Sequence, residues 1–173
     1  TVLLLNNCPF EEINTIYLDY RSNTSVNLAK VLAKNFWKRD FLWLNTSKGF
    51  DFRNIGMNEA VVLIGDQCFE YEKSFRYGTD LAGEWNKFTG LPFVFACWTA
   101  NKKIDRKFIE EFNQALKSGV MNIDAVVKSM EKAGSITGEV LKQYLTENID
   151  YHFNDDKKKG MEQFLSLMKK LES

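Results

Sequence analysis

The sequence predicts an α/β fold with a mainly parallel sheet. Before residue 100, short apolar runs alternate with segments whose apolar residues recur at helical spacing. Strands separated by helices pair in parallel, because each helix returns the chain to the same end of the sheet. After residue 100 there are three helical patterns and no strand pattern. These helices are expected to pack either on the same sheet or in a second lobe.

Five apolar runs predict the strands, and the segments around them predict the helices. The expected strands are residues 2–5, 16–20, 41–45, 60–66 and 91–100. The expected helices are residues 26–37, 50–57, 67–74, 80–90, 105–132, 136–147 and 160–171. Asp105 can cap the long helix, which Gly119 can break, and Gly90 ends the helix that precedes Pro92.

Composition and charge exclude several classes of function. Basic and acidic residues number 23 each, so no basic excess indicates nucleic-acid binding. No apolar run reaches the roughly 18 residues of a membrane-spanning helix, and the opening TVLLLNNCPF lacks the basic segment of a signal peptide. Cys8, Cys68 and Cys97 lie in apolar surroundings and are expected to be buried thiols in a reducing compartment. Since His152 is the single histidine, no metal centre is expected.

Four small polar residues, Ser22, Asn23, Thr24 and Ser25, lie between the second expected strand and the first helix. Such residues are typical helix caps. The same position exposes backbone N–H groups at the carboxyl edge of a parallel sheet, where α/β folds bind ligands. Two adjacent hydroxyls exceed what one cap requires and suit a carboxylate or a phosphate. Arg21 adds charge if its side chain turns toward this site.

The fourth expected strand ends in Gly65 and Asp66 at the same edge. Asp66 is either the cap of the helix that starts at Gln67 or a carboxylate that transfers a proton or accepts a hydrogen bond from a substrate hydroxyl. Gly65 permits close approach of the backbone. The aromatic segment 88–98 is expected to be mostly core, although its stiff turn can also form the wall of a cleft.

Three stretches carry a resemblance to a known family. In this order and spacing, YRSNTSVNLAKVL, VVLIGDQCFE and DLAGEWNKFTGLPFVFACW resemble the chorismate dehydratase family of the futalosine route to menaquinone. The third stretch is the most specific, and the resemblance extends over essentially all 173 residues. It implies a two-lobed fold like that of type 2 periplasmic binding proteins, with the active site in the cleft between the lobes, and a cytoplasmic location.

The reaction that the resemblance implies is that of a hydro-lyase. It removes water from chorismate to give 3-[(1-carboxyvinyl)oxy]benzoate. Aromatisation of the ring drives the reaction, so the family needs no metal or redox cofactor. The protein has to hold a dianion, exclude water and position the proton transfer. The expected partner is therefore a small molecule, chorismate, with no nucleic acid and no membrane.

The resemblance also assigns roles by position. It makes Asp66 the catalytic residue and makes Thr24 and Ser25 the pair that holds a substrate carboxylate. The other substrate-binding residues it implies are Ser22, Asn23, Gly65, Leu91, Pro92 and Phe93. Family members often carry Arg at the position of Asn23, and Arg21 can compensate for its absence.

Two alternative functions remain open from the sequence. The sister family of 1,4-dihydroxy-6-naphthoate synthases is similar but carries a catalytic His in the motif of Asp66, which favours the dehydratase. A solute-binding protein for a carboxylate ligand has the same lobes and no catalysis.

The resemblance divides the chain between two lobes. Residues 1–10 are expected to be the hinge strand, residues 11–95 lobe two, and residues 96–173 the returning strand and the C-terminal helices of lobe one. The opening sheet of lobe one has no counterpart in this sequence. The chain on its own is therefore expected to be inactive, and to self-associate through helix faces rich in Phe and Leu.

Overall fold

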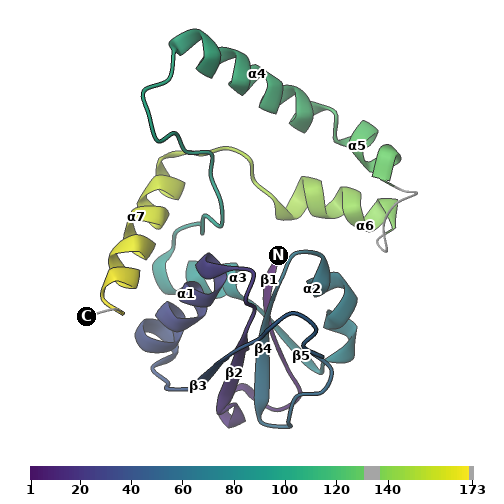
Figure 1. The fold of residues 1–173 in the computed structure, drawn as a ribbon, viewed down its shortest axis with the longest axis vertical. Helices are drawn as coiled ribbons and strands as arrows, with labels where there is room; N and C mark the ends of the chain where they lie inside the picture. The colour runs from purple at the N-terminus through teal and green to yellow at the C-terminus, as the bar shows by residue number, and fades with distance from the viewer. Residues whose placement is uncertain (131–136, 172–173) are drawn as a thin grey trace. The chain divides into compact units, whose positions relative to one another are not determined.

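A computed structural model describes residues 1–130 and 137–171 (Figure 1). The chain divides into two compact units. The sheet unit comprises Thr1–Phe95 and Phe153–Ser173, and the helical unit comprises Ala96–His152.

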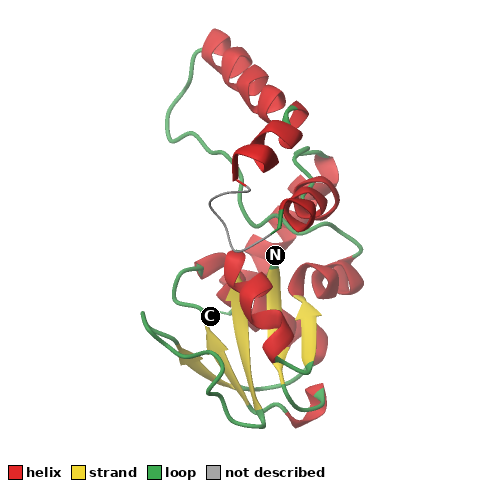
Figure 2. Cartoon of the chain, turned by 90° about the vertical axis from the view of Figure 1, so that its right-hand side faces the viewer, coloured by secondary structure: helices red, strands yellow, loops and turns green. Residues whose placement is uncertain are grey.

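The sheet unit contains one five-stranded sheet, shown in yellow in Figure 2. Its strands are β1 (Val2–Asn6), β2 (Thr15–Leu18), β3 (Leu42–Asn45), β4 (Glu59–Ile64) and β5 (Tyr77–Asp80), in the spatial order β3-β2-β4-β1-β5. β2 pairs in parallel with β3 and β4, whereas β1 is antiparallel to β4 and β5. Four of the five strands therefore run in one direction, which confirms the predicted α/β fold with a mainly parallel sheet.

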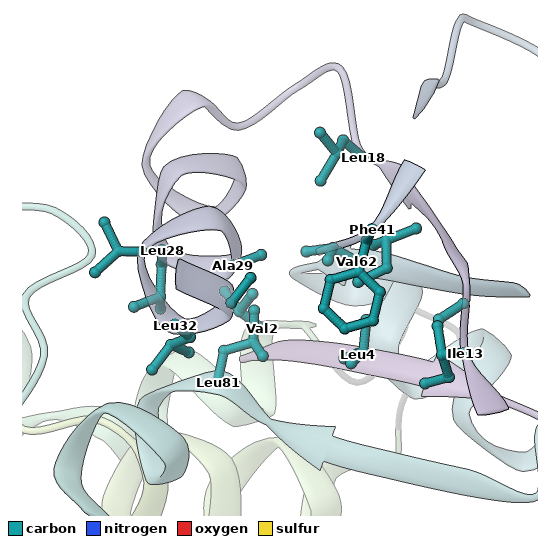
Figure 3. Packing of buried hydrophobic residues seen from close by; sticks show 14 of the residues in the cluster. Val2, Leu4, Ile13, Leu18, Leu28, Ala29, Leu32, Phe41, Val62 and Leu81 are labelled. Atoms are coloured by element: carbon teal, nitrogen blue, oxygen red, sulfur yellow. The ribbon is translucent and has the colours of Figure 1, made fainter. Parts of the chain in front are cut away.

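Helices cover both faces of this sheet. The helices of the sheet unit are α1 (Asn23–Leu32), which continues as the π-helical turn Ala33–Trp37, α2 (Asp66–Tyr71), α3 (Leu81–Thr89) and α7 (Asp155–Lys169), with short 3-10 turns at Phe10–Glu12 and Glu72–Ser74. Side chains alternate along β1, so Val2 and Leu4 belong to a core with α1, α3 and α7, while Leu3 and Leu5 pack on the α2 side. Figure 3 shows Leu28 and Leu32 of α1 in the first of these cores.

The helical unit consists of α4 (Arg106–Met121), α5 (Ile123–Met130) and α6 (Gly138–Gln143), which continues as the π-helical turn Tyr144–Asn148. Asp105 caps α4 as predicted, because its carboxylate accepts hydrogen bonds from the backbone N–H groups of Lys107 and Phe108. The predicted break of the long helix is confirmed and lies at Asn122, three residues after Gly119. The predicted helix start at Gly134 and Ser135 lies outside the described residues.

Three predictions about elements are wrong. No strand forms at residues 91–100; Leu91–Phe95 run as irregular chain and place Phe93 against α3 and α7. The fifth strand is β5, which the pattern missed because the sequence YGTD is polar and contains Gly78. Residues 50–57 form turns rather than a helix, and Phe50 and Phe52 pack on each other under the second face of the sheet.

The expectation for the cysteines holds for two of the three. Cys8 and Cys68 are buried, whereas Cys97 is exposed. Cys97 belongs to the segment that was expected to be a buried strand, so this error follows from the error in secondary structure.

Candidate functional site

The carboxyl ends of β2 and β4 define the candidate site. These strands are parallel neighbours, so both end at the same edge of the sheet. From β2 the chain passes through α1 to β3 on one side, and from β4 it passes through α2 to β5 on the other side. α1 and α2 belong to the cores on opposite faces. This arrangement is a topological switch point, the place where open α/β sheets bind their ligands.

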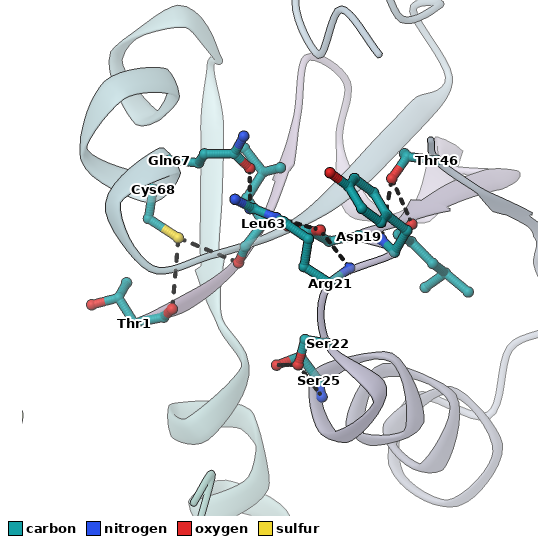
Figure 4. A network of polar contacts seen from close by, with 11 residues as sticks. Thr1, Asp19, Arg21, Ser22, Ser25, Thr46, Leu63, Gln67 and Cys68 are labelled. Atoms are coloured by element: carbon teal, nitrogen blue, oxygen red, sulfur yellow. Dashed lines mark hydrogen bonds and ion pairs between the residues drawn. The ribbon is translucent and has the colours of Figure 1, made fainter. Parts of the chain in front are cut away.

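An ion pair and a hydrogen bond connect the two strand ends (Figure 4). Asp19 follows β2 and is fully buried. Its carboxylate accepts hydrogen bonds from the Arg21 backbone N–H at 3.0 Å, from Nε at 2.9 Å and from Nη2 at 2.6 Å. Nη2 of Arg21 also donates to Oε1 of Gln67, in the first turn of α2. These bonds to Asp19 raise the pKa of the Arg21 guanidinium, which stays charged.

The cap of α1 is Ser22. Its Oγ accepts a hydrogen bond from the backbone N–H of Ser25 at 3.1 Å and lies 2.8 Å from Oγ of Ser25, whose side chain is buried. The capping interpretation of this stretch is therefore confirmed, with the cap at Ser22 rather than at Thr24 or Ser25. The backbone N–H groups of Asn23 and Thr24 belong to the first helical turn, where N–H groups have no acceptor within the helix.

The start of α2, at Gly65 and Asp66, has no side-chain cap, unlike the start of α1. Gly65 is the N-cap, with φ +61° and ψ −139°, a backbone conformation that a residue with a Cβ rarely adopts. Asp66 is the first helical residue and is exposed. The prediction that Asp66 caps the helix is wrong, because the cap residue is a glycine and no side chain supplies the cap hydrogen bond. The Asp66 carboxylate therefore does not serve as the helix cap.

A shallow hollow of about 430 Å³ opens beside α1. It is lined by Asp19, Tyr20, Ser22, Asn23, Val26 and Asn45. Two predicted residues, Ser22 and Asn23, are among these. Tyr20 and Asn45 were missed, although a signal was present: both stand at the carboxyl ends of neighbouring parallel strands.

The residues Leu91, Pro92 and Phe93 lie in a different environment. The Leu91 backbone N–H donates to Oγ1 of Thr89, and the ring of Phe93 lies 5.5 Å from that of Trp85 and 4.9 Å from that of Phe164. These contacts belong to the core between α3 and α7, and they support a packing role.

Within residues 1–130 and 137–171, no group of three or more His, Cys, Asp or Glu side chains is placed to hold a metal ion. No helix in the described part of the chain has both the length and the apolar content to cross a membrane.

The fold defines an α/β domain, compatible with one lobe of a periplasmic-binding-protein-like fold. Comparison with known families specifies it further. The model of a family described as menaquinone biosynthesis matches residues 1–170. The chain therefore belongs to the menaquinone biosynthesis family, which is consistent with the resemblance to the chorismate dehydratases. Because this is a family of biosynthesis, its substrate class is a small molecule.

Proposed function

We propose that the protein is a chorismate dehydratase that acts in the cytoplasm. The observation that carries the proposal is the connection between the two polar motifs: Arg21, beside the start of α1, is hydrogen-bonded to Gln67, the residue after Asp66. The motif expected to hold a carboxylate and the motif expected to transfer a proton therefore share one edge of the sheet. Family membership supplies the pathway in which such a reaction belongs.

In this proposal the first turn of α1 binds a carboxylate of chorismate. The N–H groups of Asn23 and Thr24 and the Thr24 hydroxyl act as donors, and the positive end of the ten-residue helix favours the anion. Ser22 and the buried Ser25 hold each other and fix the turn in place. The binding groups are thereby positioned before the substrate arrives, which lowers the entropy cost of binding.

Asp66 serves the proton transfer in this proposal. Dehydration of chorismate breaks one ring C–H bond and one C–O bond, and the ring proton and the hydroxyl group leave as water while the ring becomes aromatic. A carboxylate that makes no cap bond can approach the reacting ring, and Gly65 leaves open space beside it, since a Cβ built there would meet no atom within 4 Å.

The lobe assignment is also a proposal. Residues 1–10 are the hinge strand, residues 11–95 belong to lobe two, and residues 96–152 belong to lobe one. Phe153–Ser173, which the resemblance also assigns to lobe one, pack with the sheet unit. The resemblance supports this division.

Incubation of the complete protein with chorismate tests the proposed function. Absorbance and chromatography are expected to show 3-[(1-carboxyvinyl)oxy]benzoate in place of chorismate. A folded protein that yields no aromatic product would overturn the proposal. Chorismate recovered unchanged from a tight complex would point instead to the solute-binding alternative.

A further inference from the structure

We propose that Arg21 binds a second carboxylate of the substrate, and that the buried Asp19 positions the Arg21 guanidinium for this contact. The inference rests on the proposed function, whose substrate is a dianion. It adds a cationic group to the hydroxyl and N–H donors that are proposed to bind the first carboxylate.

The geometry of the pair leaves one side of the guanidinium unused by Asp19. Asp19 engages Nε and Nη2, which form one edge of the planar fork. Nη1 carries two further N–H donors, and a guanidinium has five donors in total. The Arg21 side chain is 37% exposed, whereas Asp19 is 0% exposed. A solute can therefore reach the fork from the side opposite the buried carboxylate.

The position of Arg21 favours an anionic ligand. Its side chain spans the switch point from the end of β2 to Gln67, and the first turn of α1 begins at Asn23, two residues further along the chain. Asp19 neutralises the charge formally, but it also fixes the guanidinium plane through two hydrogen bonds, from Nε and from Nη2. A pre-oriented fork loses little rotamer entropy when it binds a carboxylate.

Binding measurements on the complete protein test the role of Arg21. Titration calorimetry with chorismate is expected to give a Kd that rises on the order of 10- to 100-fold in Arg21→Gln, because a charge-assisted hydrogen bond is lost. Arg21→Lys keeps the charge but not the fork, and is expected to show a smaller rise, on the order of tenfold. The control is Arg53→Gln, which removes an exposed arginine paired with Glu70 and is expected to leave Kd unchanged.

A measurement on the unmodified protein covers the case in which Arg21 variants fail to fold. Chorismate is expected to slow the reaction of Arg21 with phenylglyoxal, followed by peptide mass spectrometry, and to leave the reaction of Arg53 unchanged.

The positioning role of Asp19 is tested by a double-mutant cycle. Asp19→Asn is expected to raise the Kd for chorismate in the normal background and to add little in the Arg21→Gln background. If Asp19 were merely structural, its effect on Kd would be the same in both backgrounds.

The outcomes separate the two proposals. Normal turnover by the unmodified protein, together with an unchanged Kd in folded Arg21→Gln or no protection from phenylglyoxal, overturns the role of Arg21 alone. Neither binding nor turnover by the unmodified protein overturns the proposed function, and the role of Arg21 with it.

Discussion

Two aspartates follow two parallel strands of this sheet, and their surroundings give them different roles. Asp19 is fully buried and holds Arg21, so it is part of the framework. Asp66 is exposed and makes no cap bond. A polar residue that does not stabilise the fold is a better candidate for a catalytic role than one that does.

The first prediction concerns Asp66. Asp66→Asn is expected to lower turnover of chorismate about 100-fold or more, the usual range for a lost proton-transfer group. The free energy of unfolding is expected to change by less than about 0.5 kcal/mol, because the side chain is exposed. Steady-state kinetics and urea unfolding provide the two measurements. Glu70→Gln, an exposed carboxylate in the same helix, is the matched control; similar losses of activity in both variants would contradict a specific role for Asp66.

The second prediction concerns pH and Cys68. Burial raises the pKa of this thiol from 9.0 to about 11. Between these pH values the unfolded chain releases the thiol proton while the folded chain retains it. The contribution of Cys68 to the free energy of unfolding is therefore nearly constant well below pH 9 and falls as the pH rises toward 11. At pH 10.5, ionisation of this thiol in the unfolded chain is expected to lower the free energy of unfolding by about 2 kcal/mol relative to pH 8.

Comparison with Cys68→Ala isolates this effect from other groups that titrate in the same range. The difference in free energy of unfolding between the unmodified protein and the variant is expected to move by that amount between the two pH values. An unchanged difference would show that the folded thiol ionises as it does in the unfolded chain.

At the scale of elements, α1 combines a structural cap with a proposed binding turn, and these roles fall on different residues. Ser22→Ala removes the cap bond and is expected to lower the free energy of unfolding by about 1 kcal/mol. Thr24→Ala, in the same turn, is expected to leave stability nearly unchanged and to weaken chorismate binding. Thermal unfolding and titration calorimetry distinguish the two. A loss of stability in Thr24→Ala equal to that in Ser22→Ala would remove the basis for dividing the roles in this way.

The contact of α7 with the segment after α3 gives a prediction about packing. A Cβ at Gly160 would lie 2.3 Å from the carbonyl oxygen of Pro92. Gly160→Ala is therefore expected to destabilise the sheet unit by roughly 1–3 kcal/mol, as overpacking does. Gly119→Ala, at a helical glycine whose Cβ would meet no atom within 4 Å, is expected to be neutral or stabilising. Denaturant unfolding that shows Gly160→Ala to be as stable as the unmodified protein would mean that α7 can shift away from Pro92.

The sequence predicted best those elements whose side chains share one environment, such as a strand with both faces buried. β4 is apolar and buried on both faces, and its pattern was unambiguous. The apolar segment after Gly90 has the same composition, but Pro92 has no N–H to donate, and the aromatic rings pack against helices instead of pairing in a sheet. β5 is polar at the edge of the sheet, so only its pairing with β1 reveals it.

Some residues of the candidate site could likewise be predicted from the sequence, and others could not. Ser22–Ser25 and Gly65–Asp66 could be found from the sequence because each begins within four residues of the end of an apolar strand. The partnership of Arg21 with Asp19 and Gln67 could not, since it depends on the direction of one side chain across 46 residues of chain separation. Periodicity fixes which face a residue occupies, and it carries no information about such directions.

At the scale of the whole molecule, the helical unit exposes large apolar side chains. Trp98 is 77% exposed and Met121 74% exposed, and Phe108 and Phe112 stack with ring centroids 6.0 Å apart on α4. Exposed apolar clusters of this kind mark surfaces that associate.

The chain of 173 residues is accordingly expected to self-associate. Light scattering is expected to show a molecular mass that rises with protein concentration, and Phe108→Ser is expected to reduce that rise. Leu42→Ser, at an exposed leucine of the sheet unit, is the control and is expected to have no effect. A mass that stays monomeric at all concentrations would contradict the expectation.

The position of β1 has a consequence for synthesis of the protein. β1 lies between β4 and β5, and the ribosome makes it before either neighbour. About 70 residues separate it from β5, which at common rates of translation corresponds to roughly 4–14 s. Until β5 is made, the apolar stretch Val2–Asn6 lacks one of its two neighbouring strands in the nascent chain. An apolar strand that lacks a neighbour for this time is a segment to which a chaperone can bind.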